Sequence, residues 1–183
     1  MDKIPFIETG FLITEEDFIN MSLTRQKYIT PRENRLILRI LGFLAVLCGV
    51  AAYIVLRGNI YQIICWILLI AIGLFALFYY DVINPSMIRK QAKNFYNFNK
   101  NAITSKTVRF YDDSFQINSD NYKLSVPKKF IYTAVESKTT ILIYLDKNEF
   151  CFIPKRVFSE EQLKKVQDFV RSKNPDKYHE IIM

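Results

Sequence analysis

Few residues of this chain carry the side chains that enzymes use for catalysis. The single histidine, His179, lies near the carboxyl terminus, which argues against a Ser-His-Asp or Cys-His site in a folded domain. The three cysteines, Cys48, Cys65 and Cys151, show no metal-ligand spacing, and one histidine gives a zinc site little support. The sequence contains no phosphate-binding glycine loop and no dinucleotide fingerprint. We therefore predict a protein that is not an enzyme and that uses no metal or cofactor.

The most suggestive charged residues are Lys155 and Arg156, which follow Pro154 and precede Phe158. Two adjacent cations can bind a phosphate group or contact a partner protein. The alternative is structural: Pro154 and Phe158 fix a turn from a strand into a helix while both cations face water. Surface charges beside a helix start are common, so we favour the structural alternative. Lys155 and Arg156 are kept as candidate phosphate or partner contacts.

Two long apolar runs dominate the first half of the chain. They extend from Leu36 to Leu56 and from Ile60 to Tyr80. Each reaches the ~20 apolar residues that a helix needs to cross ~30 Å of hydrocarbon. A buried helix of a globular domain usually keeps a polar stripe, which neither run has. A cleaved signal peptide fits poorly too, because the first run starts late and a second follows at once. We predict a transmembrane hairpin over residues 31–86.

The ends of the predicted hairpin carry their own signals. Thr30 opens a capping box, which places the start of the first helix near Pro31. Asn84-Pro85 is expected to break or restart the second helix. Arg39 and Asp81 fall at about the same depth when counted from the turn. A single such pair at a membrane interface anchors a hairpin rather than marking a transport path.

Small residues recur on one face of each predicted membrane helix. Such a stripe lets helices approach closely in lipid. We favour ordinary packing within the hairpin, because the partner helix is covalently at hand, and the alternative is a dimer interface. The residues are Gly42, Ala45, Gly49 and Ala52 in the first helix and Gly73 and Ala76 in the second.

Basic residues flank both ends of the predicted hairpin, whereas the turn offers only Arg57. By the positive-inside rule both termini face the cytoplasm, and the chain crosses a bacterial inner or plasma membrane twice. The net charge of +7 concentrates beside the membrane, which favours anionic lipids, and no basic run interleaved with aromatics suggests nucleic-acid binding. The candidate membrane-surface contacts are Arg32, Arg35, Arg39, Arg89, Lys90 and Lys93.

The segments next to the hairpin are expected to be short. Residues 4–13 look extended, and Thr14 then caps a helix that has acids in its first turn. Phe18 and Met21 give this helix an apolar face, which we expect to pack against the later domain rather than on lipid. Residues 87–103 predict a basic juxtamembrane helix followed by a linker.

From residue 104 the periodicity changes from that of helices to that of strands. Six short runs separated by polar turns predict an antiparallel meander. Ser159 then opens a second capping box, and the helix behind it ends near Ser172. A curved sheet closed by one amphipathic helix is typical of a pleckstrin-homology-like domain. The strand runs are 108–110, 115–117, 122–126, 130–137, 140–145 and 150–153, and the apolar helix face holds Leu163, Val166, Phe169 and Val170.

Several segments resemble the YcxB-like family. The most specific is residues 150–163, Phe-Cys-Phe-Ile-Pro-Lys-Arg-Val-Phe-Ser-Glu-Glu-Gln-Leu. The resemblance extends to residues 110–113, to residues 12–18 and to the paired apolar helices. Members often carry a tryptophan just after the third strand, where this chain has Pro-Lys-Lys-Phe at 127–130. The resemblance implies a bacterial membrane protein with a pleckstrin-homology-like cytoplasmic domain, and it implies no particular activity.

Together these features predict an α+β membrane protein in which a two-helix transmembrane hairpin carries a cytoplasmic, pleckstrin-homology-like β-domain. The function expected is that of a non-enzymatic, membrane-anchored binding or regulatory module, with the lipid bilayer and a protein or a second copy of the chain as partners. The alternatives are a dimeric structural or scaffold membrane protein and a sensor of anionic lipid headgroups. The predicted divisions are 1–30, 31–86, 87–103, 104–174 and a terminal tail at 175–183.

Overall fold

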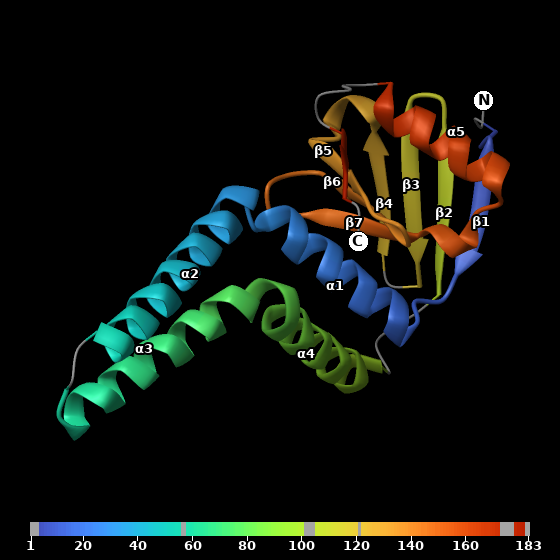
Figure 1. Ribbon diagram of the computed structural model, residues 1–183. Helices are drawn as coiled ribbons and strands as arrows, with labels where there is room; N and C mark the ends of the chain where they lie inside the picture. Colours follow the sequence, from blue (N-terminus) through green and yellow to red (C-terminus); the bar gives the residue numbers. More distant parts are fainter. Residues whose placement is uncertain (1–3, 56–57, 101–104, 121, 173–177, 182–183) are drawn as a thin grey trace. The chain divides into compact units, whose positions relative to one another are not determined.

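The computed structural model describes residues 4–55, 58–100, 105–120, 122–172 and 178–181 (Figure 1). The chain forms two compact units. The β-domain unit combines residues 1–28 with residues 91–183, and the hairpin unit contains residues 29–90. The hairpin is therefore an insertion within the chain of the β-domain, and the segment before it belongs structurally with the segment after it.

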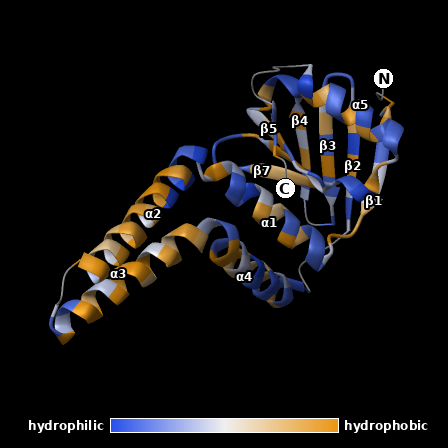
Figure 2. Ribbon diagram, viewed as in Figure 1, coloured by the Kyte–Doolittle hydropathy of each residue, from blue (hydrophilic) through white to orange (hydrophobic). Residues whose placement is uncertain are grey.

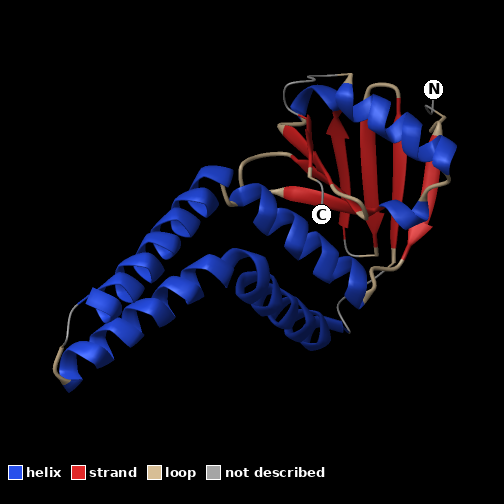
Figure 3. Cartoon of the chain, in the orientation of Figure 1, coloured by secondary structure: helices blue, strands red, loops and turns tan. Residues whose placement is uncertain are grey.

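The β-domain unit contains two four-stranded sheets (Figure 3). All six strands predicted for the second half of the chain are present, but they divide between two sheets instead of forming one meander. The division follows β4, at the 3₁₀ turn Lys128–Phe130. The first sheet has the order β1-β2-β3-β4, with β1 (Ile7–Phe11), β2 (Lys106–Tyr111), β3 (Ser114–Ser119) and β4 (Tyr122–Pro127). The second has the order β7-β6-β5-β8, with β5 (Thr133–Glu136), β6 (Thr140–Tyr144), β7 (Phe150–Pro154) and β8 (Tyr178–Glu180).

Strand β1 pairs with β2 although the whole hairpin lies between them in sequence. The pairing is antiparallel and runs from Ile7 opposite Phe110 to Phe11 opposite Lys106. The sequence predicts an extended amino-terminal segment, and the structure shows the strand to which it pairs. A sheet begun before the hairpin is thus completed after it.

The predicted terminal tail contains a strand that the sequence analysis did not anticipate. In β8, Tyr178, His179 and Glu180 pair in parallel with the three residues 134–136 of β5. Just beyond it, the backbone N–H of Ile181 donates to the carbonyl of Glu136 over 2.7 Å. Three residues are too few for a strand pattern to be recognised from sequence, and their partner edge exists only after the second sheet has formed.

The main core lies between the two sheets and helix α5 (Glu160–Arg171). The helix contributes Val166, Phe169 and Val170, and the ring of Phe169 meets that of Phe110 on β2 edge-on at 5.4 Å between centroids. The capping box predicted at Ser159 is present, with Gln162 as its second member. The predicted helix and its apolar residues are therefore confirmed.

Helix α1 (Glu15–Ile29) packs on the β-domain, as predicted. Its start is fixed by reciprocal hydrogen bonds between Thr14 and Asp17, at 2.9 and 3.2 Å. Met21 is buried in a second apolar cluster beside strand β6. Helix α4 (Asn84–Asn99) lies against α1 within this unit, because Phe95 stacks on Phe18 with ring centroids 5.4 Å apart.

The hairpin unit consists of α2 (Arg32–Val55) and α3 (Ile60–Phe78). Both are long and apolar enough to cross a membrane. Figure 2 shows them as the most continuously hydrophobic helices of the chain. Most of their apolar side chains are exposed, whereas a core helix of a soluble domain is mostly buried. The backbone of Arg35 donates to Pro31, which places the first turn where the sequence predicts it.

The two helices touch through their small residues. A Cβ atom on Gly42 would lie 2.8 Å from the carbonyl oxygen of Gly73, and one on Gly73 would lie 2.7 Å from that of Gly42. The same Cβ on Gly42 would be 3.1 Å from Ala76, and one on Gly49 would meet Ile70 at 2.6 Å. The small-residue stripe is thus occupied by packing within the hairpin, which is the interpretation favoured from sequence.

The α-helix restarts at Asn84-Pro85, as the sequence predicts: α3 ends at Phe78 and α4 begins at Asn84. A single π-helical turn, η1 (Tyr79–Ile83), joins α3 to α4, and the N–H of Asn84 donates to the carbonyl of Tyr79 five residues earlier. Proline lacks an N–H to donate in an α-helix, and its ring clashes with the carbonyl four residues before it. Widening the preceding turn accommodates the ring, so the helical path continues.

Candidate functional site

The corner between β7 and α5 holds the two cations singled out from sequence. Pro154 ends β7, and residues Lys155–Val157 form one 3₁₀ turn, η4. The backbone N–H of Lys155 donates to the carbonyl of Thr139 over 2.8 Å, and that of Phe158 donates back to Lys155 over 3.1 Å. Backbone hydrogen bonds therefore fix the conformation of the corner, and this conformation sets the directions in which the side chains of Lys155 and Arg156 point.

Lys155 points into the domain and forms an ion pair with Glu136 of β5. The Lys155 side chain is 16% exposed and that of Glu136 only 7%. The same carboxylate oxygen, Glu136 Oε1, accepts a hydrogen bond of 2.6 Å from Gln167 Nε2 of α5. One buried acid thus joins three elements of the domain: the second sheet, the corner and the closing helix.

Arg156 reaches the amino-terminal segment. Its Nη2 lies 2.6 Å from Asp17 Oδ2 and its Nε lies 3.0 Å from Asp17 Oδ1, which is a two-point contact with the carboxylate. The same Nη2 donates to the carbonyl of Leu12 over 2.8 Å. A guanidinium group fits such a forked arrangement better than an ammonium group does. Arg156 thereby fastens helix α1 and the loop before it to the carboxyl-terminal half of the chain.

The environment of Asp17 changes its acidity. Burial raises the pKa of this carboxyl, but hydrogen bonds from Arg156 and Thr14 act in the opposite direction and together outweigh burial. The pKa of Asp17 is therefore below its usual value. The carboxylate remains charged at neutral pH and holds Arg156 in place.

The expectation that both cations face water is wrong for Lys155, whose side chain is only 16% exposed. The cause is the buried carboxylate of Glu136, which costs less free energy when it is paired with a cation. Arg156 is half-exposed, yet it too is committed to an acid. Whether Lys155 or Arg156 also contacts phosphate or a partner stays a prediction.

The six candidate membrane-surface cations differ in their surroundings. Arg39 donates to Asp81 over 2.7 and 2.6 Å, so the two residues predicted to lie at equal depth form an ion pair. Lys93 contacts Glu15 of α1 at 3.1 Å. Among the residues that the structure describes, Arg32, Arg89 and Lys90 form no ion pair, and the same holds for Arg35.

The remaining chemically reactive side chains are those of the metal-ligand types and the cysteine thiols. Within the described residues no three His, Cys, Asp or Glu side chains gather closely enough to hold a metal ion. The pKa of the Cys151 thiol is raised to about 11 by burial, so this cysteine is protonated at neutral pH and is a poor nucleophile.

A comparison with protein-family models matches residues 110–170 to the family described as YcxB-like protein. This segment is YcxB-like. The match confirms the resemblance predicted from sequence, and it includes strands β3 to β7, the corner and most of α5. Comparisons with curated proteins and with solved structures found no match.

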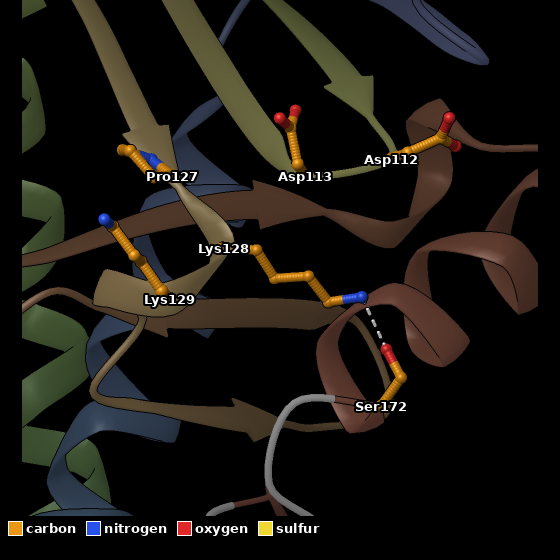
Figure 4. Close-up of a pocket in the computed structure, with 6 residues that line it drawn as sticks. All are labelled: Asp112, Asp113, Pro127, Lys128, Lys129 and Ser172. Carbon is orange, nitrogen blue, oxygen red and sulfur yellow. Dashed lines mark hydrogen bonds between the residues drawn. The ribbon is translucent and has the colours of Figure 1, made fainter.

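The YcxB-like segment also lines an open pocket of about 690 Å³ (Figure 4). Lys128 lies along its wall, with its Nζ 2.6 Å from Ser172 Oγ and 4.6 Å from the ring centre of Phe169. Acids and cations both line the pocket, which gives it no preference for one sign of charge. The lining residues are Asp112, Asp113, Pro127, Lys128, Lys129 and Ser172.

Sequence reasoning did not identify the acids that hold the two cations. Glu136 follows the apolar residues of a predicted strand, and an acid at such a position signals a buried charge that requires a partner. The sequence indicates for Asp17 only a place in the first helical turn. The pairing of Asp17 with Arg156 spans 139 positions of sequence, and no local pattern indicates a contact at that distance.

Proposed function

We propose that this protein is a non-enzymatic module anchored in a membrane by α2 and α3, whose β-domain binds a protein partner in the cytoplasm. The observation that carries the proposal is the insertion of two exposed apolar helices between the paired strands β1 and β2. Such helices gain free energy by transfer from water into hydrocarbon, at about 25 cal/mol for each Å² of apolar surface.

The β1–β2 pairing favours two membrane crossings. Ile7 and Phe110 pair in one sheet, so residues before and after the hairpin lie on the same side of any membrane. An even number of spans satisfies this requirement, and the chain has two helices of sufficient length. The positive-inside rule then favours the cytoplasm, because Arg32, Arg35, Arg89 and Lys90 flank the two helices on the side of the β-domain.

We further propose that the β-domain is pleckstrin-homology-like. Seven strands, β1 to β7, form two antiparallel sheets, and the helix that follows them packs its apolar face into the core between them. In this arrangement the hairpin occupies the connection between the first and second strands of the domain.

A protein partner is favoured over a lipid headgroup by the charges at the corner. Lys155 and Arg156, the residues that best resembled a phosphate site, are held by Glu136 and Asp17. A phosphate group at this corner has to compete with both carboxylates. A dimer formed through the small residues of the hairpin is disfavoured too, because Gly42 and Gly73 already face each other.

The membrane topology is tested by cysteine accessibility in cells that express a variant lacking the three native cysteines. Asn59→Cys, in the exposed turn, should react with an impermeant maleimide from outside. Lys138→Cys, exposed on the β-domain, should react only after the cells are opened. Labelling of Lys138→Cys in intact cells would contradict the proposed orientation.

Partner binding is tested by photo-crosslinking in intact membranes. A photoreactive amino acid is placed at Phe130, which is 61% exposed on the β-domain, and at Tyr132, which is 40% exposed. A discrete adduct should form at one of these positions and not at the control position Lys147 on another turn. Adducts with lipid alone at every position would instead favour the headgroup-sensor alternative.

A further inference from the structure

The edge of strand β5 is covered by the end of the chain itself. Strand β8 pairs with it through three residues, and Ile181 adds one further backbone hydrogen bond to Glu136. Every residue of β5 is buried, whereas β8 is partly to fully exposed. In the second sheet, the buried strand β5 is therefore covered at its edge by β8, which is short and more exposed.

The side chains of β8 alternate between two helices. Tyr178 and Glu180 face α5, where the Arg171 guanidinium lies 4.6 Å from the Tyr178 ring centre and pairs with the Glu180 carboxylate. His179 faces α1, with its ring centre 5.6 Å from that of Tyr28. Ile181 packs on the same side, in the cluster that contains Met21. The β5 edge is thus the floor of a groove with α5 on one side and α1 on the other.

The strand that occupies this groove leaves polar atoms without partners. Glu136 Oε2 and the Tyr178 hydroxyl are both buried and make no hydrogen bond with the described residues. Glu136 is only 6% exposed, so water reaches this oxygen poorly. A buried oxygen without a donor is destabilising, because its lost hydration is not replaced by a hydrogen bond. The resident strand is therefore an incomplete match for the groove.

We propose that the β5 edge is a recognition groove for an extended segment of a partner protein, and that β8 is a resident strand which this segment displaces. The proposal rests on the function proposed above and specifies the mode of partner binding. The incoming strand runs parallel to β5 and carries an aromatic residue, any residue, an acidic residue and an aliphatic residue in succession. Addition of a strand to a sheet edge is a general way to bind peptides, with backbone hydrogen bonds giving affinity and alternate side chains giving specificity.

The acidic position follows from charge. Arg171 is the cation that faces the third residue of the groove, and it now pairs with Glu180. The aromatic position follows from the place of Tyr178, whose ring lies beneath the same guanidinium and packs on the main core. The aliphatic position is that of Ile181 beside α1. A cation at the third position would lose the ion pair that Arg171 makes with Glu180 and would lie against the guanidinium group.

The groove is tested with the full chain in lipid nanodiscs and a fluorescent peptide that reproduces residues 177–183. Two variants open the groove: a chain that ends at Ser172, and the intact chain with Glu180→Lys, which places a cation against Arg171. Both should bind the peptide saturably, and the unaltered chain should bind it at least tenfold more weakly, because its own strand competes at high effective concentration. The matched control is a peptide with Glu180→Lys, which should not bind.

A charge exchange gives the sharpest readout. In the chain that ends at Ser172, Arg171→Glu should abolish binding of the natural peptide and restore binding of the Glu180→Lys peptide. Peptides selected from a random library on the opened chain should show the aromatic-x-acidic-aliphatic pattern. The proposal is overturned if both opened variants fold, as judged by circular dichroism, and neither binds peptide, or if the charge exchange fails to restore binding.

Two outcomes separate this proposal from the general function. Photo-crosslinking at Phe130 or Tyr132 that persists in a chain whose groove binds no peptide would overturn the groove and retain partner binding. A dimer of the intact chain that Glu180→Lys abolishes would identify the occupant as β8 of a second copy, and would overturn a separate partner.

Discussion

The ion pair between Lys155 and Glu136 gives the most quantitative test of the corner. Lys155→Ala leaves the Glu136 carboxylate, 7% exposed, with Gln167 as its one remaining donor among the described residues. Removing one member of a buried pair typically costs 3–5 kcal/mol, because the remaining charge stays desolvated. The bond from Gln167 persists, so we expect the lower end of this range, about 3 kcal/mol.

This loss can be measured by urea-titrated pulse proteolysis in dodecyl maltoside, in which the detergent retains the hairpin while the β-domain unfolds. For a domain of this size the urea dependence is about 2 kcal/mol per M, so the midpoint should fall by about 1.5 M. Lys165→Ala removes a cation of the same type from a fully exposed pair with Glu161 and should leave the midpoint unchanged. The double variant Lys155→Met with Glu136→Leu removes both charges and should recover most of the loss.

A fall of less than about 0.5 M in Lys155→Ala, equivalent to about 1 kcal/mol, would refute the reasoning. It would mean that Glu136 is solvated in the folded chain and that Lys155 faces water, as the sequence alone suggested. A double variant that is no more stable than Lys155→Ala would separately show that packing of the lysine stem, rather than charge pairing, stabilises the corner.

Four further outcomes follow from the same structure. The pKa of Asp17 is lowered in the folded chain, so the contribution of this carboxylate to stability is complete above about pH 4 and is lost as the pH falls through the lowered pKa. Asp17→Asn should therefore flatten the decline of the urea midpoint between about pH 5 and pH 3. With Cys48 and Cys65 replaced, Cys151, whose pKa is about 11, should react with a maleimide at pH 7.5 far more slowly when folded than in urea, and equal rates would show that the thiol is not buried. Gly42→Leu should splay the hairpin and increase proteolysis at its turn, whereas a substitution of the exposed Leu44 in the same helix should not. Phe169→Asp should unfold the β-domain, since it places an unpaired charge in the main core, and a melting curve like that of the parent would show that α5 does not close the sheets.

Local patterns predicted most of the elements. The six strands of the second half, the capped helix behind Ser159 and the two long apolar helices each depend on neighbours within a few residues, so periodicity and capping signals identify them. The small-residue stripe also predicted the contact between the two apolar helices, because Gly42 and Gly73 let their backbones approach closely.

The contacts that the sequence did not reveal are those between distant segments. β1 pairs with β2 although the entire hairpin separates them in sequence, and Asp17 pairs with Arg156, which lies near the opposite end of the chain. Their individual residues are ordinary for a strand and a helix start, so nothing local distinguishes them. The burial of Lys155 belongs to the same class, since it depends on where β5 places Glu136. Pairings of this kind are properties of the tertiary fold.

The interrupted sheet also bears on how the protein is made. Strand β1 leaves the ribosome first, but its partner β2 is synthesised only after both apolar helices. In a membrane-inserted chain, the β-domain therefore cannot mature until the second helix has turned back across the bilayer. If only one helix is inserted, β1 and β2 lie on opposite sides of the membrane and cannot pair. The unpaired edge of β2 is then a template for aggregation. In the proposed topology, completion of the sheet thus requires that both helices are inserted, and a failed hairpin leaves the β-domain unfinished and open to proteolysis.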